Sequence, residues 1–317
     1  MSILQKIKKF LTRQGATYYH VNELHKMLVN DLKTAKLNLG QIQGMLNAAR
    51  SSINSLHEVE FQVFSQWGDD GIIQYLVNKL SPLNKTCIEF GVENYRESNT
   101  RYLLINNNWS GYVIDGSDEH IRFIEQDTIS WACELYTRSA FITAENINEL
   151  LKYPGFEPEV GLLSIDIDGN DYWIWRSIDV ISPVIVVSEY NALFGNNTCW
   201  TVPYDPAFDK YKKHSSIIYY GASLGALCQL AEEKGYVFVG CNSAGNNAYF
   251  VRKDRMVPGI PAPSLAEGFV RSRFREAMVN GRRPIGTERV KLIMGMPVWD
   301  VASNKETVIN PDIISYS

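Results

Sequence analysis

Two hydrophobic patterns divide the chain near residue 60. From residue 28 onward, apolar residues recur at alternating steps of four and three, which is the heptad spacing of a helix that packs along one seam. The seam positions are Leu28, Leu32, Ala35, Leu39, Ile42, Leu46, Ala49, Ile53 and Leu56. After residue 60, short apolar runs alternate with amphipathic stretches, which is typical of strands that alternate with helices. The pattern therefore predicts a helical segment followed by an α/β domain.

The heptad seam requires a partner, because a helix with one apolar stripe must bury that stripe. The partner is either a second copy of the chain or the body of the same protein. We expect a homo-oligomer formed through these N-terminal helices. Gly40 and Gly44 each weaken a helix by about 1 kcal/mol relative to alanine, so a strong free-standing coiled coil is not expected.

The first 15 residues also have helical spacing, with basic residues between the apolar ones. The apolar set is Ile3, Leu4, Ile7, Phe10 and Leu11, and the basic set is Lys6, Lys8, Lys9 and Arg13. A short helix packed on its own domain is the favoured interpretation. The alternative is a basic amphipathic helix that makes peripheral contact with an anionic membrane. A polar turn region at residues 51–60 then leads into the main domain.

Continuous apolar runs between residues 61 and 255 predict an α/β fold with a doubly wound, mostly parallel sheet. The expected strands cover residues 86–92, 111–117, 140–146, 160–168 and 182–190. The expected helices cover residues 66–80, 98–109, 121–127, 147–153 and 223–236, with Ser98 as the N-terminal cap of the second. Residues 236–254 are expected to form a terminal antiparallel hairpin. The predicted organisation is a helical segment (1–60), the α/β domain (61–255) and a C-terminal extension (256–317).

Composition places the chain among ordinary globular proteins. Its 317 residues are 45% hydrophobic and 21% charged, and the net charge of −4 argues against a nucleic-acid binder. Five cysteines without a C-x-x-C pair fit reduced thiols. No apolar run approaches the roughly 18 residues of a membrane span, and no signal-peptide core follows the N-terminal charges. We therefore expect a cytoplasmic protein.

Polar side chains follow each of the five expected parallel strands. In chain order they are Glu89, Asp115, Glu145 with Asn146, Asp166 with Asp168, and Glu189 with Asn191. In doubly wound sheets, ligands bind beyond the carboxyl ends of the strands. We therefore expect this edge of the sheet to be the active site.

Four stretches in fixed order support a family resemblance. They are "CIEFGV" followed by "SNT", then "GYVIDGS", "LLSIDIDGNDYW" and "YVFVGCNSAGNNAYFV". Over residues 60–254 the chain resembles the Rossmann-like S-adenosylmethionine-dependent methyltransferases. Within that class it is most similar to FkbM-like enzymes, which are linked to sugar and surface-polysaccharide modification. The resemblance implies S-adenosylmethionine as cofactor and O-methylation of a sugar or glycan hydroxyl.

The resemblance also implies a cofactor site. Glu89 and Gly91 match the acid and the first glycine at the end of the first strand, near the methionine part of the cofactor. The stretch "GVENYRESNT" lacks the second and third glycines of the usual loop. We expect a longer loop that reaches the cofactor through Ser98, Asn99 and Thr100, and weak cofactor affinity is the alternative.

Two further positions complete the implied cofactor site. Asp115 matches the acid that accepts hydrogen bonds from the ribose hydroxyls, and a surface turn is the alternative interpretation. Asn146 or Glu145 would lie near the adenine.

The stretch "DIDGNDY" predicts a metal site. Asp166 and Asp168, two residues apart on a strand, would face the same side and hold one ligand. The stretch also resembles the aspartate-rich strand end of the metal-dependent O-methyltransferases that act on catechols and phenylpropanoids, whose next strand supplies an acid or amide. Here that strand offers Glu189 and Asn191, so we expect Asp166, Glu189 and Asn191 to bind Mg²⁺ or Mn²⁺. The metal-free alternative is a pocket shaped by hydrogen bonds of residues 166–171.

Methyl transfer to a hydroxyl requires removal of a proton. A metal lowers the pKa of a bound hydroxyl, and a nearby base accepts the proton. Asp168 and His214 are the candidates for this base. The aromatic residues Tyr172, Trp173 and Trp175 either stack on a sugar ring or pack in the core.

The C-terminal extension is rich in arginine. Its arginines include Arg271, Arg273, Arg275, Arg282 and Arg283. Arginine binds phosphate and carboxylate well, so an anionic acceptor such as a phosphorylated glycan or uronic acid would suit this segment, and a solvated helix face is the alternative.

Two other classes of function were weighed. A non-catalytic binding module on a methyltransferase-like fold would tolerate the missing glycines, but it would not require the acids at the sheet edge. A nicotinamide enzyme is disfavoured, because no G-x-G-x-x-G follows the first strand.

Overall fold

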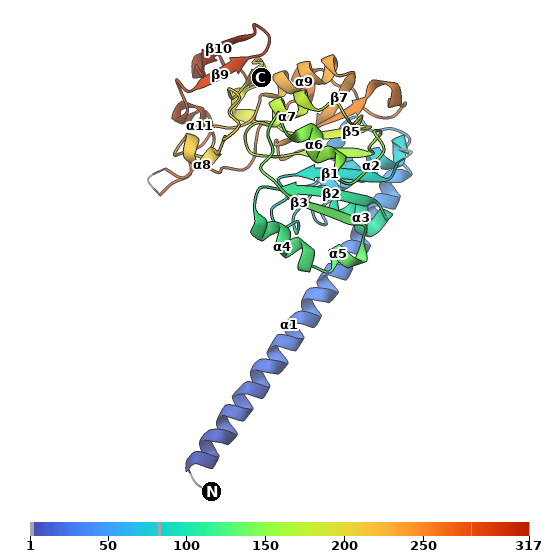
Figure 1. Cartoon of the computed structure of the whole chain (residues 1–317), viewed down its shortest axis with the longest axis vertical. Coiled ribbons are helices and arrows are strands. Elements are labelled where there is room, and N and C mark those ends of the chain that lie inside the picture. Colours follow the sequence, from blue (N-terminus) through green and yellow to red (C-terminus); the bar gives the residue numbers. More distant parts are fainter. Residues whose placement is uncertain (1–2, 82–83, 280, 317) are drawn as a thin grey trace.

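The computed structural model describes residues 3–81, 84–279 and 281–316. An α/β body carries one long N-terminal helix that projects away from it (Figure 1). The strands are β1 (Thr86–Phe90), β2 (Ser110–Asp115), β3 (Leu135–Ser139), β4 (Leu162–Ile165), β5 (Ile185–Glu189), β6 (Trp200–Thr201), β7 (Tyr236–Cys241), β8 (Asn247–Arg252), β9 (Pro297–Asp300) and β10 (Lys305–Val308). The longer helices are α1 (Ile3–Ala48), α2 (Asp69–Leu80), α3 (Arg101–Asn107), α4 (Asp118–Gln126), α6 (Ile147–Lys152), α7 (Asp171–Ser177), α9 (Leu224–Glu233) and α11 (Thr287–Leu292). The four-residue helices are α5 (Ile129–Ala132), α8 (Lys210–Lys213) and α10 (Leu265–Gly268).

The main sheet has seven strands in the order β3-β2-β1-β4-β5-β8-β7. Strands β1 to β5 are parallel, and β8 runs antiparallel to both β5 and β7. The direction of winding reverses between β1 and β4, which is the point where open α/β sheets bind ligands. The predicted doubly wound sheet with a terminal antiparallel hairpin is confirmed.

Two apolar layers sandwich the sheet. Helices α6, α7 and α9 cover one face, where Trp175 packs with Ile88 of β1. Helices α2, α3, α4 and α5 cover the other face, where Leu76 packs in the same layer as Cys87. Neighbouring residues of β1 thus point to opposite layers, as strand alternation requires. Both faces of the central strands are buried, which explains their continuous apolar runs.

The prediction for the third strand was wrong. Strand β3 covers residues 135–139, whereas residues 140–146 leave the sheet and form the turn before α6. β3 is an edge strand with mostly half-buried residues, so it lacks the apolar run that marks the central strands. The apolar residues just after it, Phe141 and Ile142, produced the false signal.

The beginning of α3 also differs from its prediction. This helix begins at Arg101, and its N-terminal cap position is Thr100. Ser98 lies two residues earlier, and its Oγ accepts hydrogen bonds from the backbone N–H groups of Thr100 and Arg101, both at 3.1 Å. The serine thus supports the helix start without occupying the cap.

The N-terminal segment forms one continuous helix. α1 runs from Ile3 to Ala48, so the prediction of a separate short helix docked on the domain was wrong. The side chains of residues 3–8 and 10–18 lie outside the described part of the chain, and so does the predicted membrane contact of that segment. Among the described residues, no helix is both long enough and apolar enough to cross a membrane.

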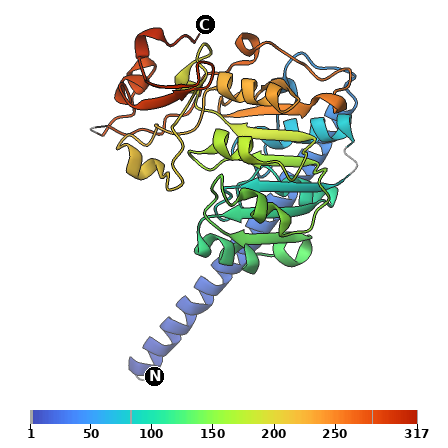
Figure 2. The same cartoon turned by 45° about the horizontal axis from the view of Figure 1, so that its top comes forward.

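A second lobe has its own three-stranded sheet. Residues 193–220 and 277–314 contribute to a third apolar cluster that includes Phe194, Trp200, Val290 and Val298. In this lobe, β6 pairs with β9 and β9 pairs with β10. Since β9 and β10 belong to the C-terminal extension, the extension forms one sheet with β6 from the middle of the chain. Figure 2 shows the red C-terminal strands beside the yellow segments that follow β5. The extension contributes the residues of one wall of the pocket described next.

Candidate active site

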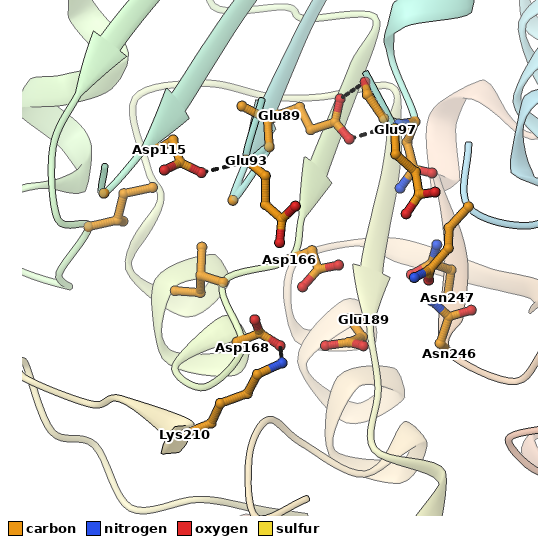
Figure 3. A pocket seen from close by; sticks show the side chains of 18 of the residues that line it. Glu89, Glu93, Glu97, Asp115, Asp166, Asp168, Glu189, Lys210, Asn246 and Asn247 are labelled. Carbon is orange, nitrogen blue, oxygen red and sulfur yellow. Dashed lines mark hydrogen bonds and ion pairs between the residues drawn. The ribbon is translucent and has the colours of Figure 1, made fainter. Parts of the chain in front are cut away.

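A pocket of about 630 Å³ lies at the carboxyl ends of the parallel strands. It is bounded by the turn after β1, the end of β2, the turn after β4, the end of β5 and a segment of the C-terminal extension. Its acidic lining residues are Glu89, Glu93, Glu97, Asp115, Asp166, Asp168, Glu189 and Glu276, and its basic ones are Lys210, Arg275 and Arg283. Figure 3 shows these acids converging from several strand ends.

Three of the acids form a tight cluster. Asp166, Asp168 and Glu189 each offer one carboxylate oxygen, and the three oxygens lie within 4.8 Å of one another. β4 ends at Ile165, so strand alternation does not bring the two aspartates together. Instead, Asp168 has a φ of 56°, a left-handed conformation that turns the chain back on itself. The sequence predicted the pair correctly, but for a different geometric reason.

The cluster holds three carboxyl groups, one of which is paired with a lysine. Burial and the neighbouring carboxylates raise the pKa of Asp166 and of Glu189 well above their usual range. Lys210 forms an ion pair with Asp168, and no other ion pair of these three acids is present among the described residues. Oε2 of Glu189 is buried and has no hydrogen-bond partner in the described part of the chain. A set of oxygen ligands with an unpartnered buried member fits a hard divalent cation.

Asp171 and Asn191 have structural roles beside this cluster. Asp171 holds the turn, because its carboxylate accepts hydrogen bonds from the N–H groups of Ile167 at 2.9 Å and Gly169 at 3.0 Å. The side-chain amide of Asn191 donates to the carbonyl oxygens of Ile218 and Tyr220, both at 3.0 Å. Its Oδ1 accepts a hydrogen bond from the N–H of Leu193 at 3.1 Å. The structure therefore does not bring Asn191, a predicted metal ligand, into the cluster.

Glu89 organises the loop that follows β1. Its buried carboxylate accepts hydrogen bonds from Ser98 Oγ at 2.6 Å, Asn99 N–H at 2.8 Å, and Thr100 N–H and Oγ1 at 3.1 and 2.6 Å. Burial raises the pKa of Glu89, and these donors oppose that shift. Ser98 and Asn99 also line the pocket, whereas Thr100 does not. The predicted cofactor residues of this loop are brought together, but they bind Glu89.

The turn after β1 has left-handed backbone conformations at three positions, although only one of them is a glycine. Gly91 has a φ of 69°, and an added Cβ would lie 1.7 Å from the carbonyl oxygen of Asp166. Two non-glycine residues of the same turn, Glu93 and Tyr95, have φ values of 46° and 59°. Non-glycine residues adopt this conformation at a cost of about 1 kcal/mol each. The turn thus keeps left-handed positions although only the first of them is a glycine, and the longer loop stays a prediction.

Asp115 lies where the resemblance places a ribose-binding acid. Its carboxylate accepts hydrogen bonds from the N–H groups of Glu93 and Ser117, both at 2.8 Å, and contacts Nδ1 of His120 at 3.1 Å. Beside it, Gly116 faces the ring of Phe141, since an added Cβ would lie 3.7 Å from that ring. Asp115, Gly116 and Phe141 all line the pocket.

The residues predicted near the adenine lie behind this wall. Asn146 Oδ1 accepts a hydrogen bond from Thr143 N–H at 2.8 Å, and its amide donates to the carbonyl oxygen of Phe141 at 2.9 Å. Glu145 pairs with Tyr204 Oη at 2.6 Å. Neither Asn146 nor Glu145 lines the pocket. Phe141 and Ile142 supply the apolar surface there, and the false strand assignment concealed them.

The two predicted bases have different positions. Asp168 lines the pocket, whereas His214 lies outside the lining and its Nδ1 contacts Ser216 Oγ at 2.7 Å. Lys210, four residues before His214, reaches the pocket instead and pairs with Asp168. Residues 210–214 therefore supply the site with a lysine and not with the predicted histidine.

The predicted aromatic wall belongs mostly to the interior. Tyr172 and Trp175 are buried in the core, and Trp173 donates a 2.8 Å hydrogen bond from Nε1 to the carbonyl oxygen of Val202. The pocket is lined by Trp67 and Phe274 instead, whose rings are nearly parallel with centroids 5.9 Å apart. This pair joins the segment before α2 to the C-terminal extension, so no local motif indicated it.

Comparison with protein families found no match, and comparison with curated protein sequences also found none. Among solved structures, the N-terminal domain of EvdMO1 with SAH bound is similar to 59% of this chain and 80% of that chain, with 11% identity and a TM-score of 0.38. An S-adenosylmethionine-dependent methyltransferase from Clostridium acetobutylicum is similar over 58% of this chain and 89% of that chain, with 10% identity and a TM-score of 0.36. The CurJ carbon methyltransferase is similar over 62% of this chain and 56% of that chain, with 10% identity and a TM-score of 0.38. Similarity at these values carries no inference about activity, which is argued below from the site itself.

Proposed function

We propose that this protein is an S-adenosylmethionine-dependent O-methyltransferase that methylates a sugar hydroxyl with the help of a divalent metal. The observation that carries the proposal is the Asp166, Asp168 and Glu189 cluster, which shares one pocket with Asp115. The three-acid cluster suits a hard cation and an acceptor oxygen, and Asp115 suits the ribose of a nucleoside. Metal-assisted methyl transfer needs both within one cavity.

The β2 side of the pocket would hold the adenosine. The backbone N–H groups of Glu93 and Ser117 fix the Asp115 carboxylate in place. That carboxylate would accept further hydrogen bonds from the ribose hydroxyls. Phe141 and Ile142 supply apolar surface for a purine ring on the same side. Preorganised polar groups of this kind set the orientation of a ligand more than its total affinity.

Asp166 and Glu189 would hold Mg²⁺ or Mn²⁺. When bound, the metal would lower the pKa of the acceptor hydroxyl. Asp168 is the proposed proton acceptor of the cluster, because its side chain is 47% exposed whereas Glu189 is buried. Lys210 pairs with Asp168 and so helps to position its carboxylate. The pocket would then have to hold the acceptor hydroxyl in line with the methyl group of the cofactor.

The C-terminal wall would bind the acceptor. Trp67 and Phe274 are aromatic residues of this wall that a sugar ring could contact, and Arg275 and Arg283 line the same pocket. Arg283 donates to the carbonyl oxygen of Glu276 at 2.9 Å, which fixes the wall near Lys210. Arginine at the mouth favours an acceptor with a phosphate or carboxylate group. An acidic sugar in glycan or surface-polysaccharide assembly fits this combination.

The test is isothermal titration of the full chain with S-adenosylhomocysteine, with Mn²⁺ and with chelator. We compare wild type with Asp115→Asn and with the matched control Glu119→Gln, an exposed acid four residues away. Loss of binding by at least about tenfold in Asp115→Asn alone supports the cofactor site. Equal binding in all three proteins overturns it.

A non-catalytic binding module is the second candidate. The observation that favours it is the carboxylate of Glu93, which lines the pocket from a turn that lacks the second and third glycines of the usual loop. This alternative predicts no heat with S-adenosylhomocysteine in any condition, from protein shown to be folded by circular dichroism.

A further inference from the structure

We propose that α1 pairs with α1 of a second copy of this chain in a parallel, in-register, two-stranded coiled coil. This inference is independent of the proposed activity. Five seam residues of α1 are large, apolar and exposed. They are Leu28, Leu32, Leu39, Ile42 and Leu46, with exposed fractions of 59%, 64%, 66%, 55% and 60%. A helix that is apolar along one stripe and free in water requires a partner.

The body of the protein binds a different face of α1. Gly40, Gly44 and Asn47 are buried against it, and an added Cβ on Gly40 would lie 2.5 Å from Cγ2 of Val63. Asn47 donates a 2.8 Å hydrogen bond to the carbonyl oxygen of Val59. The two glycines therefore serve close helix packing. At 100° per residue, this face lies on the order of 130° away from the seam around the helix.

The body does not cover the part of the seam that lies on α1. The glycine face carries the contact with α2 and the segment around Val63, while the seam stays exposed even at Leu39, Ile42 and Leu46, beside that contact. Figure 1 shows the remainder of α1 extending away from the body. The body buries the last two predicted seam residues, Ile53 and Leu56, which follow the end of α1, but within the described residues nothing covers the seam positions of residues 28–46.

The charges beside the seam point to a second copy and to its direction. With Leu32, Leu39 and Leu46 at the heptad a positions, Asp31 is at g and Lys36 is at e of the following heptad. In a parallel, in-register pair, g of one helix lies beside the following e of its partner. Self-pairing thus places Asp31 of each copy beside Lys36 of the other, twice by symmetry.

The test measures the mass of the full chain by light scattering over a range of concentrations. We compare wild type with the seam variant Leu32→Glu/Leu39→Glu and the matched control Asn30→Glu/Thr34→Glu, which adds the same charges outside the seam. A mass of two chains for wild type and control, and of one chain for the seam variant, supports the proposal. A wild-type mass of one chain or of four chains overturns it, and so does a seam variant that stays dimeric. Circular dichroism and thermal unfolding of the body show that the seam variant is folded.

Charge reversal tests the direction. Asp31→Lys and Lys36→Asp should each shift the dimer toward monomer by a few-fold in dissociation constant, and the double reversal should restore wild-type dimerisation. Failure of the double reversal to restore it contradicts parallel, in-register pairing.

Discussion

The backbone N–H of Glu93 donates a 2.8 Å hydrogen bond to Oδ2 of Asp115, which ties the turn after β1 to the end of β2 (Figure 3). The left-handed conformation of Glu93 makes this bond possible and directs its carboxylate into the pocket. A position that normally favours glycine thus contributes a charge to the site.

We expect this charge to discriminate between the two forms of the cofactor. S-adenosylmethionine carries a sulfonium charge that S-adenosylhomocysteine lacks, so Glu93→Gln should weaken binding of the former more. At moderate effective dielectric the difference is about 1 kcal/mol, roughly fivefold in affinity. Titration of both ligands into wild type and Glu93→Gln measures the ratio. An unchanged ratio means that Glu93 does not face the sulfonium.

The acid cluster should lower the stability of the metal-free protein and strengthen its binding of a divalent metal. Asp166→Asn removes one of three crowded carboxylates, so we expect it to raise the free energy of unfolding of metal-free protein by about 1 kcal/mol. The same change should weaken Mn²⁺ binding at least about tenfold. Thermal unfolding with chelator and titration with Mn²⁺ alone give the two values, and Glu97→Gln is the control because it lines the pocket outside the cluster. Unchanged Mn²⁺ affinity in Asp166→Asn would contradict the metal site.

Lys210 should compete with a metal for the acid cluster. Its ammonium pairs with Asp168, and the neighbouring acids help to raise the pKa of Lys210 despite its burial. Lys210→Met should therefore increase Mn²⁺ affinity several-fold, because the cluster loses its resident cation. Lys212→Met, which removes an exposed lysine paired with Asp209, should leave the affinity unchanged. Weaker Mn²⁺ binding in Lys210→Met would instead indicate that the lysine positions a ligand.

A buried carboxyl near the start of α2 predicts a pH dependence of stability. Burial raises the pKa of Asp70 from 3.8 to about 6, although Oδ2 accepts hydrogen bonds from the N–H groups of residues 63–65. A carboxyl with a raised folded-state pKa contributes stability that is complete below the unfolded value and is lost as the pH rises through the folded value. The window is therefore about pH 4 to 6, and the contribution is at most about 3 kcal/mol.

Asp70→Asn isolates this contribution. Chemical unfolding of both proteins across that window should give a free energy of unfolding that falls more steeply with pH in wild type than in the variant. Equal slopes would mean that Asp70 titrates normally in the folded protein.

Local pattern was sufficient for the central parallel strands and for part of the site. The apolar runs at β1, β2, β4 and β5 identified the buried parallel strands, because both faces of these strands are covered. The polar residues after those strands identified the pocket edge, since parallel strands end on one side of a sheet. Edge strand β3 was misplaced, because a half-exposed strand has no apolar run. Asn146 was misplaced with it.

Only the tertiary structure decided which residues meet. Lys210, Trp67 and Phe274 reach the pocket from segments far from the strand ends, and His214 and Asn191 turn away from it. The sequence by itself determined the helical seam of α1 and the acids after the central strands, because both depend on short-range periodicity. Contacts between residues distant in sequence decide which face of α1 the body binds. They also decide which acid faces a lysine. Such contacts are chosen by packing, which no local spacing encodes.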